Sequence, residues 1–247
     1  AVDLEHMSSQ SVDEDNLYID NAGSDGQFLS KQSGGTGGLS WATVATSTDG
    51  EYRGWVVYDS AAAHTWTKPS GLTRIKVYVT GGGGGGGGHN ASESGCGGTA
   101  GGTAIKVIEA GSLGATETAT VGAGGAGGDP GGDGVASSFG SHCSATGGTG
   151  GPMEAGGSSY MNGGVGSSGD LNIRGQGSTS LGTGLQGSNG GSSYWGGGGG
   201  GGINYGRPHG GAGTYGSGGG GGYQTGAGAA GNGGNGGIGL IVVEQYF

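Results

Sequence analysis

The sequence predicts an all-β protein with no substantial α-helix. Short antiparallel strands are combined with bundled polyglycine II helices, and these helices form a brace that carries distal loops. Three observations lead to this fold class. Glycine accounts for 75 of the 247 residues. Several glycine runs place a small non-glycine residue at every third position. Short segments of alternating polar and apolar residues lie between these runs, which is the pattern of half-buried strands.

Disorder and collagen are the two alternatives that this composition raises. Glycine-rich chains without a collagen period are usually of low complexity and unordered. A collagen triple helix needs a sustained Gly-X-Y repeat, whereas this chain has four prolines and keeps that repeat nowhere for long. The glycine runs differ in length, are interrupted by segments with aromatic residues and are flanked by predicted strands. An ordered structure is therefore favoured over both alternatives.

The N-terminal part of the chain is predicted to contain only short strands. Residues 1–7 look like a cloning remnant and do not enter the fold prediction. Within residues 8–54, short strands are predicted at 16–20, 27–30 and 39–44. A short hairpin is marginally stable in water by itself. This part therefore needs a partner, and further copies of the same segment would supply one.

The part from residue 55 to residue 247 contains the stronger strand predictions. The most convincing strand is 73–80, in which Ile75, Val77 and Val79 alternate with polar or aromatic residues. The continuous apolar run at 239–244 is typical of a buried strand. The other predicted strands are 55–59, 64–67, 103–109 and 117–121.

Long glycine runs separate these strands. An extended left-handed helix has three residues per turn and a rise of about 3.1 Å per residue, so a small residue at every third position forms one outward row. Residues 122–128 and 231–237 have this spacing. Such helices have no internal hydrogen bonds, and only glycine lets their backbones approach closely enough to pair with one another, so several must form together. The runs are 81–88, 122–132, 147–151, 196–202, 218–222 and 226–237.

The charge of the chain restricts its partners. Eight lysines and arginines oppose eighteen aspartates and glutamates, which gives a formal net charge of −10. This charge repels nucleic-acid phosphates and anionic lipid head groups. The sequence also has no run of about 18 apolar residues that could span a membrane. We therefore expect no nucleic-acid partner and no membrane insertion.

The sequence shows no convincing catalytic or metal site. Its five histidines lack the spacing of metal ligands, and the acidic turn at 129–134 has too few ligands for a calcium loop. His142 and Cys143 are adjacent, and adjacent side chains on a strand point to opposite faces. We expect no enzymatic activity, no cofactor and no metal ion. The two cysteines, Cys96 and Cys143, are expected to be reduced, and the sequence leaves open whether they pair.

Aromatic side chains are concentrated in the segments between glycine runs. Tyrosine and tryptophan provide large contact areas at low entropic cost, and with serine, glycine and asparagine they match the composition of antibody binding loops. The alternative is that the rings cap the ends of a glycine bundle. Either role suits a single ring, and binding is favoured for the set. The predicted binding residues are Tyr160, Met161, Tyr194, Trp195, Tyr205, His209, Tyr215 and Tyr223.

Three stretches carry a resemblance to a known family. Residues 23–44 look like a fibre-shaft repeat, residues 67–80 form a turn and a strand that lead directly into a glycine run, and residues 239–247 form the closing strand. In this order, with glycine-rich segments between them, they are similar to the glycine-rich tail-fibre tips of tailed bacteriophages. The long-tail-fibre adhesins of T-even-type phages belong to that group.

This resemblance implies that residues 8–54 are a shaft-like fibre segment and that residues 55–247 are a receptor-binding tip. The polyglycine helices would form a rigid brace, and the loops between them would bind a bacterial surface receptor, either an outer-membrane protein or a surface glycan. Shaft and tip in one chain favour a homotrimer that joins the remainder of the tail fibre. Its place would be the virion, at the tip of the tail fibre, after assembly in the host cytoplasm. The alternatives are a structural glycine-rich protein or an ice-binding protein without a receptor.

Overall fold

A computed structural model of the chain gives its fold. The structure describes residues 23–25, 27–31, 39–43, 50–88, 94–152, 160–179, 186–203, 207–223 and 231–247. The chain divides into two compact units, Ala1–Thr48 and Asp49–Phe247. Both contain antiparallel strands, and the short 3₁₀ helix η3 (Ala110–Ser112) is the only helix within the described ranges. The predicted all-β fold class is therefore confirmed.

The first unit contains a two-stranded hairpin. Strand β1 (Gln27–Lys31) pairs antiparallel with β2 (Leu39–Thr43), and both coincide with predicted strands. The strand predicted at 16–20 lies outside the described residues. The side chains of Phe28 and Leu29 are 46% and 39% exposed. This hairpin therefore buries little apolar surface of its own.

The described residues of the second unit form two five-stranded antiparallel sheets and a short ladder. The first sheet has the order β12-β6-β5-β14-β3, with β3 (Tyr52–Tyr58), β5 (Arg74–Thr80), β6 (Thr103–Glu109), β12 (Leu171–Ile173) and β14 (Leu240–Tyr246). The second sheet has the order β11-β9-β8-β7-β4, with β4 (Ala63–Thr67), β7 (Thr116–Thr120), β8 (Ser137–Phe139), β9 (Cys143–Ala145) and β11 (Gly166–Ser167). The ladder pairs β10 (Tyr160–Met161) with β13 (Ser178–Thr179).

The hydrophobic core lies between the two sheets. Alternation along β5 points Ile75, Val77 and Val79 inward, and all three are fully buried. Trp66 and Phe139 enter the same core from the second sheet, with their ring centroids 5.8 Å apart. Inward-facing residues of two stacked sheets fill the space between them in this way in β-sandwiches. A second, smaller cluster of Tyr78, Leu240 and Val242 is buried apart from this core, with Trp195 packed against it.

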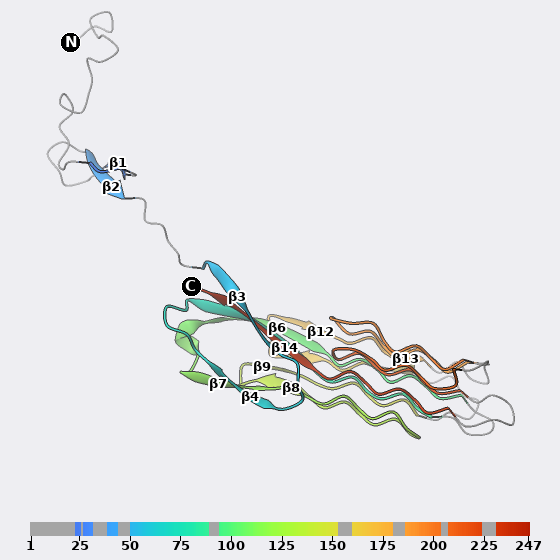
Figure 1. The fold of residues 1–247 in the computed structure, drawn as a ribbon. Helices are drawn as coiled ribbons and strands as arrows, with labels where there is room; N and C mark the ends of the chain where they lie inside the picture. Colours follow the sequence, from blue (N-terminus) through green and yellow to red (C-terminus); the bar gives the residue numbers. More distant parts are fainter. Residues whose placement is uncertain are drawn as a thin grey trace, which may run out of the picture. The chain divides into compact units, whose positions relative to one another are not determined.

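Strands of both sheets continue directly into glycine-rich segments that run side by side away from the sheets (Figure 1). Strand β5 leads into segment 81–88, and segment 231–239 leads into β14, which is its neighbour in the sheet. We call the assembled segments the glycine array. It consists of residues 81–88, 94–102, 121–136, 146–152, 160–165, 174–179, 186–203, 207–223 and 231–239.

Segment 81–88 lies inside the array and hydrogen-bonds to five of its other segments, and to one of them, 121–136, on both sides of that segment's turn. Its backbone N–H groups donate to three neighbours in rotation, so that every third residue, at Gly81, Gly84 and Gly87, reaches the same neighbour. Its carbonyl groups accept hydrogen bonds in a similar rotation. A repeat of three residues is the one expected of an extended helix with three residues per turn. The neighbours that accept lie in 96–102, 128–135 and 234–237, and those that donate lie in 125–128, 148–151 and 219–222.

Segment 81–88 has no room for side chains. A Cβ built on any residue from Gly81 to Gly87 would come within 3.0 Å of a neighbouring backbone atom. For Gly84 that atom is the carbonyl oxygen of Thr149. The uninterrupted glycine run therefore follows from the position of the segment, because other backbones surround it on every side.

Two further segments are enclosed in the same manner. In segment 94–102, Cys96, Thr99 and Ala100 are buried, and the Thr99 hydroxyl accepts the N–H of Thr149 at 2.7 Å. Segment 217–223 exchanges backbone hydrogen bonds with six others, which lie at 84–87, 95–98, 188–191, 199–202, 208–211 and 234–237. The glycine run at 218–222 belongs to this enclosed segment, so it too consists of glycine because neighbouring backbones leave no room for side chains.

In segments at the surface of the array, every third residue forms a row that faces away from the other segments. We call it the open row. Asn232 and Asn235 are exposed in segment 231–239, as the three-residue spacing predicts. In segment 196–203 the open row consists of glycine, because a Cβ on Gly197 or Gly200 would have no atom within 4 Å. Glycine is therefore a packing requirement in the enclosed segments but not at these two positions.

Candidate functional site

The glycine array has one end at the sheets and a second end where its segments reverse direction (Figure 1). Backbone hydrogen bonds join outgoing and returning segments there, as between the Ile203 N–H and the Arg207 carbonyl at 2.8 Å. We call this second end the distal end. The last described residues of its outgoing segments are Gly88, Pro152, Thr179, Ile203 and Tyr223, and the first of its returning segments are Ser94, Tyr160, Gln186, Arg207 and Gly231.

The structure divides the predicted binding residues between the two ends of the array. Those near the distal end are Tyr160, Met161, His209 and Tyr223. Those beside the sheets, and not at the distal end where they were expected, are Tyr194, Trp195 and Tyr215. The remaining residue, Tyr205, lies outside the described residues.

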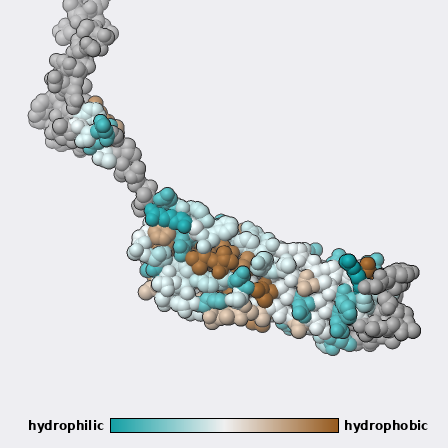
Figure 2. All heavy atoms as spheres, viewed as in Figure 1, coloured by the Kyte–Doolittle hydropathy of each residue, from teal (hydrophilic) through white to brown (hydrophobic). Residues whose placement is uncertain are grey.

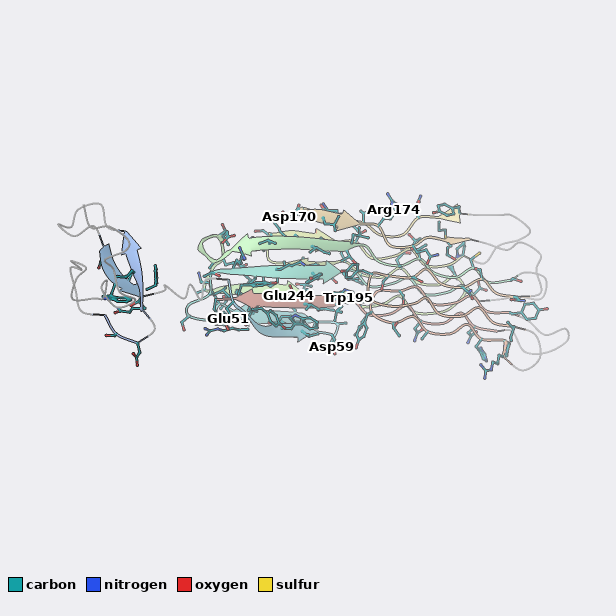
Figure 3. All side chains as sticks on the ribbon, turned by 90° about the horizontal axis from the view of Figure 1, so that it is seen from above. Glu51, Asp59, Asp170, Arg174, Trp195 and Glu244 are labelled. Atoms are coloured by element: carbon teal, nitrogen blue, oxygen red, sulfur yellow. The ribbon has the colours of Figure 1, made fainter. Side chains whose placement is uncertain are left out.

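Trp195 belongs to a structural contact between the array and the first sheet, and Figure 3 shows it where the strands pass into the glycine segments. Its indole N–H donates to Thr80 Oγ1 at 3.0 Å, and its ring meets that of Tyr78 edge to face at 5.5 Å. Thr80 is fully buried, and its hydroxyl also bonds to Thr103 at 2.8 Å. Tyr194 packs edge-on against Trp195 at 4.9 Å. These contacts fit the capping role that the sequence left open for single rings.

The predicted residues at the distal end differ in exposure. Tyr160 is 69% exposed. His209 is also exposed, and its Nδ1 accepts the Asn232 N–H at 3.1 Å. Met161 is half-buried and Tyr223 is buried. Tyr160 therefore offers the largest exposed aromatic surface of the predicted residues at this end.

A groove of about 320 Å³ lies beside Tyr160, between two antiparallel segments of the array. Apart from Tyr160, the lining residues were missed from the sequence. One of them, Asn189, had a signal in the sequence, because Gln186 and Asn189 lie three residues apart, as exposed residues do on a segment with three residues per turn. The groove is lined by Tyr160, Gln176, Gly177, Ser178, Ser188, Asn189 and Gly190.

Thiol and carboxyl groups elsewhere take part in packing. Cys96 and Cys143 are buried and do not form a disulfide, and burial raises the pKa of the Cys143 thiol to about 11. A protonated thiol is a poor nucleophile. Burial also raises the pKa of Glu117, but hydrogen bonds from the Gly114 N–H and from His142 outweigh this effect and hold that pKa below its usual value. His142 thus pairs with Glu117 and does not activate its neighbour Cys143.

The surface of the second unit differs between the sheets and the array. Figure 2 shows the main apolar area over the sheets, whereas the array has a nearly neutral hydropathy. In the described ranges, no group of three or more His, Cys, Asp or Glu side chains could hold a metal ion. No helix in those ranges is long and apolar enough to cross a membrane. Exposed apolar side chains of the first sheet are Tyr52, Trp55, Val57, Val107 and Leu171.

Comparison with known proteins gives one family. A family model described as a glycine-rich domain matches residues 57–246, which extend from β3 to the end of β14. No curated protein matches the chain. The matched range covers the glycine array and nearly all of both sheets, and it leaves out the first unit.

Proposed function

We propose, on the premise that the chain belongs to the family of glycine-rich domains, that it is the receptor-binding tip of a bacteriophage tail fibre. The chain attaches the virion to a bacterial surface receptor, which is an outer-membrane protein or a surface glycan. It acts as a binding protein and not as an enzyme, and it uses no cofactor or metal ion.

The observation that carries this proposal is the arrangement of the glycine array. One end of the array is continuous with two sheets that share a core, and the chain reverses between glycine segments at the other end. Binding residues are commonly placed on connections that a rigid scaffold holds in position. Backbone hydrogen bonds across all of the array segments supply such a scaffold.

Assembly forms the second part of the proposal. Three copies of the chain form a homotrimer, and residues 8–54 are the shaft-like segment that joins the remainder of the tail fibre. Phe28 in the first unit, and Trp55 and Val57 in the second, are exposed apolar side chains that contacts between chains would cover. The net charge of −10 disfavours nucleic acid as a partner.

A polymer attached at the distal end is expected to block binding to host cells. Gln186→Cys places a thiol at this end, and both native cysteines are at most 3% exposed, so a maleimide-linked polyethylene glycol reacts with the new thiol alone. The attached polymer keeps the distal end away from any receptor. Binding of the fluorescent chain to candidate host cells, measured by flow cytometry, should fall at least about tenfold.

The matched control carries the same polymer at the opposite end of the second unit. Ser112→Cys places the thiol on exposed η3, beyond the end of β6 that is remote from the array. We expect this variant to retain binding within about twofold of the unlabelled chain. Equal loss from both positions, or no binding of the unlabelled chain to any candidate host, would contradict the proposal.

A further inference from the structure

We propose that the groove beside Tyr160 binds a neutral sugar unit of a bacterial surface glycan. This inference rests on the proposed function and names the class of receptor that the distal end recognises. The groove has a volume of about 320 Å³, which is at the lower end of the range for small-molecule sites. This size suits one or two sugar rings of a longer chain.

Tyr160 supplies a stacking surface at one side of the groove. Its ring is 69% exposed, and no other ring among the described residues packs against it. A Cβ built on Gly177 would lie 3.2 Å from the Tyr160 hydroxyl oxygen, so the side chain lies close to the glycine backbone of the groove. The face of an aromatic ring is electron-rich. It therefore attracts the weakly positive C–H groups on one side of a pyranose ring.

Two amide side chains supply hydrogen-bond donors with a fixed orientation. The Gln176 Oε1 atom accepts the Ser192 N–H at 2.9 Å, and the Asn189 Oδ1 atom accepts the Gly201 N–H at 2.8 Å. Because a backbone N–H can only donate, each amide must turn its oxygen toward the backbone. Each NH₂ group is then left with two donors that bond to no other described residue. Paired, oriented donors of this kind suit the hydroxyl oxygens of a sugar.

The hydroxyl groups of the groove are held in place by the array. The Ser178 hydroxyl donates to the Asn189 carbonyl at 3.2 Å, and the Ser188 Oγ atom accepts the Gly97 N–H at 2.7 Å. The first bond joins the two segments that form the walls of the groove, and the second ties one wall to the enclosed segment 94–102. The walls are therefore set by the fold, so the groove is formed before any ligand binds.

The groove has no charged side chain that would bind an ionic ligand. None of its lining residues carries a charge, and the chain as a whole has a net charge of −10. Anionic sugars and phosphates would meet repulsion without a cationic partner. The lining also contains no aliphatic side chain that would hold an apolar residue of a peptide. A neutral, polyhydroxylated ligand is the class that remains.

The experiment compares sugar binding by the whole chain and by variants that remove only the amide donors. Asn189→Asp and Gln176→Glu keep an oxygen for the backbone N–H but lose the NH₂ group. The probes are glucose, galactose, mannose, N-acetylglucosamine and the polysaccharide released from the lipopolysaccharide of a host that the chain binds, observed by saturation-transfer NMR. We expect affinity for the bound sugar to fall about three- to tenfold for each amide variant and at least tenfold for Tyr160→Ala.

Asn235→Asp is the matched control. Its Oδ1 atom accepts the Gly127 N–H at 2.8 Å, in the same way as Asn189, but it lies on another surface of the array. This variant adds the same charge and should bind the sugar with unchanged affinity. Unchanged affinity in the Asn189 and Gln176 variants, or no sugar bound by the parent chain, would overturn the proposal.

Cell binding measured in parallel separates this proposal from the proposed function. If the parent chain and Asn189→Asp bind cells equally well, and protease treatment of the cells abolishes binding, the receptor is a protein and the sugar proposal is wrong. If the chain binds the sugar but no cells, the groove is a sugar site and the tail-fibre function is wrong. Loss of cell binding after periodate oxidation of the cell surface is the result that the sugar proposal predicts.

Discussion

Gly84→Ala is expected to prevent the interior of the glycine array from packing, whereas Gly200→Ala should leave it intact. A Cβ on Gly84 would fall on the carbonyl group of Thr149, and neither backbone can move aside without losing hydrogen bonds to its other neighbours. Overpacking of an ordinary core costs about 1–3 kcal/mol. Because the obstacle here is backbone, we expect the free energy of unfolding to fall by at least about 3 kcal/mol.

The same substitution at Gly200 provides the control, because a Cβ there would meet no atom within 4 Å. Alanine also restricts the unfolded chain, which stabilises a protein by about 0.4–1 kcal/mol where the backbone accepts it. Guanidinium unfolding followed by circular dichroism measures both changes. If the two substitutions changed the free energy of unfolding equally, segment 81–88 would not be enclosed by other backbones.

Phe139→Ala is expected to destabilise the sheets and the array together. Phe139 is fully buried and packs against Trp66 in the core between the sheets. Removing a buried phenylalanine side chain costs about 3–5 kcal/mol. Because β5 and β14 continue into enclosed or neighbouring segments of the array, the loss should appear in one cooperative transition of the whole second unit.

Two probes test this cooperativity. Hydrogen exchange of the Val77 and Val79 amides in β5 reports on the core, and exchange of the Gly81 to Gly88 amides reports on the array. Phe139→Ala should lower the free energy of unfolding by the same amount with both probes. Val135→Ala is the control, since Val135 is 53% exposed on the segment that leads into β8, and it should change stability by less than about 0.5 kcal/mol. An array that stays folded while the core melts would contradict this coupling.

The fold was predictable from local sequence patterns where those patterns were long. Alternation predicted a strand at 73–80, and β5 occupies Arg74–Thr80. The three-residue spacing of 231–237 predicted the exposed asparagines of that segment. The short strands β8, β9, β11 and β12 were not predicted, because two or three residues carry no measurable alternation. The pairing of β5 with β14 also depends on contacts between distant parts of the chain.

The candidate site was only partly predictable because composition does not tell which end of the array a turn occupies. Trp195 and Tyr160 lie in similar glycine-rich surroundings, yet one caps the sheets and the other is exposed near the distal end. The end at which a turn lies depends on the direction in which the preceding segment runs. The chain runs from β12 in the sheet toward the distal end, and segment 186–193 runs back toward the sheets. The turn at Trp195 therefore lies at the sheets. Without β12, this direction could not be assigned.

Residue-resolved hydrogen exchange of the backbone amides tests the central claim, which is that the glycine runs form an ordered array with a three-residue hydrogen-bond repeat. The N–H groups of Gly199 and Gly202 donate to the enclosed segment 217–223, whereas no backbone or side-chain acceptor among the described residues faces those of Gly197 and Gly200. We predict slow exchange at Gly199 and Gly202, and fast exchange at Gly197 and Gly200. Uniformly fast exchange through this run would contradict the ordered array, and uniformly slow exchange would contradict its repeat.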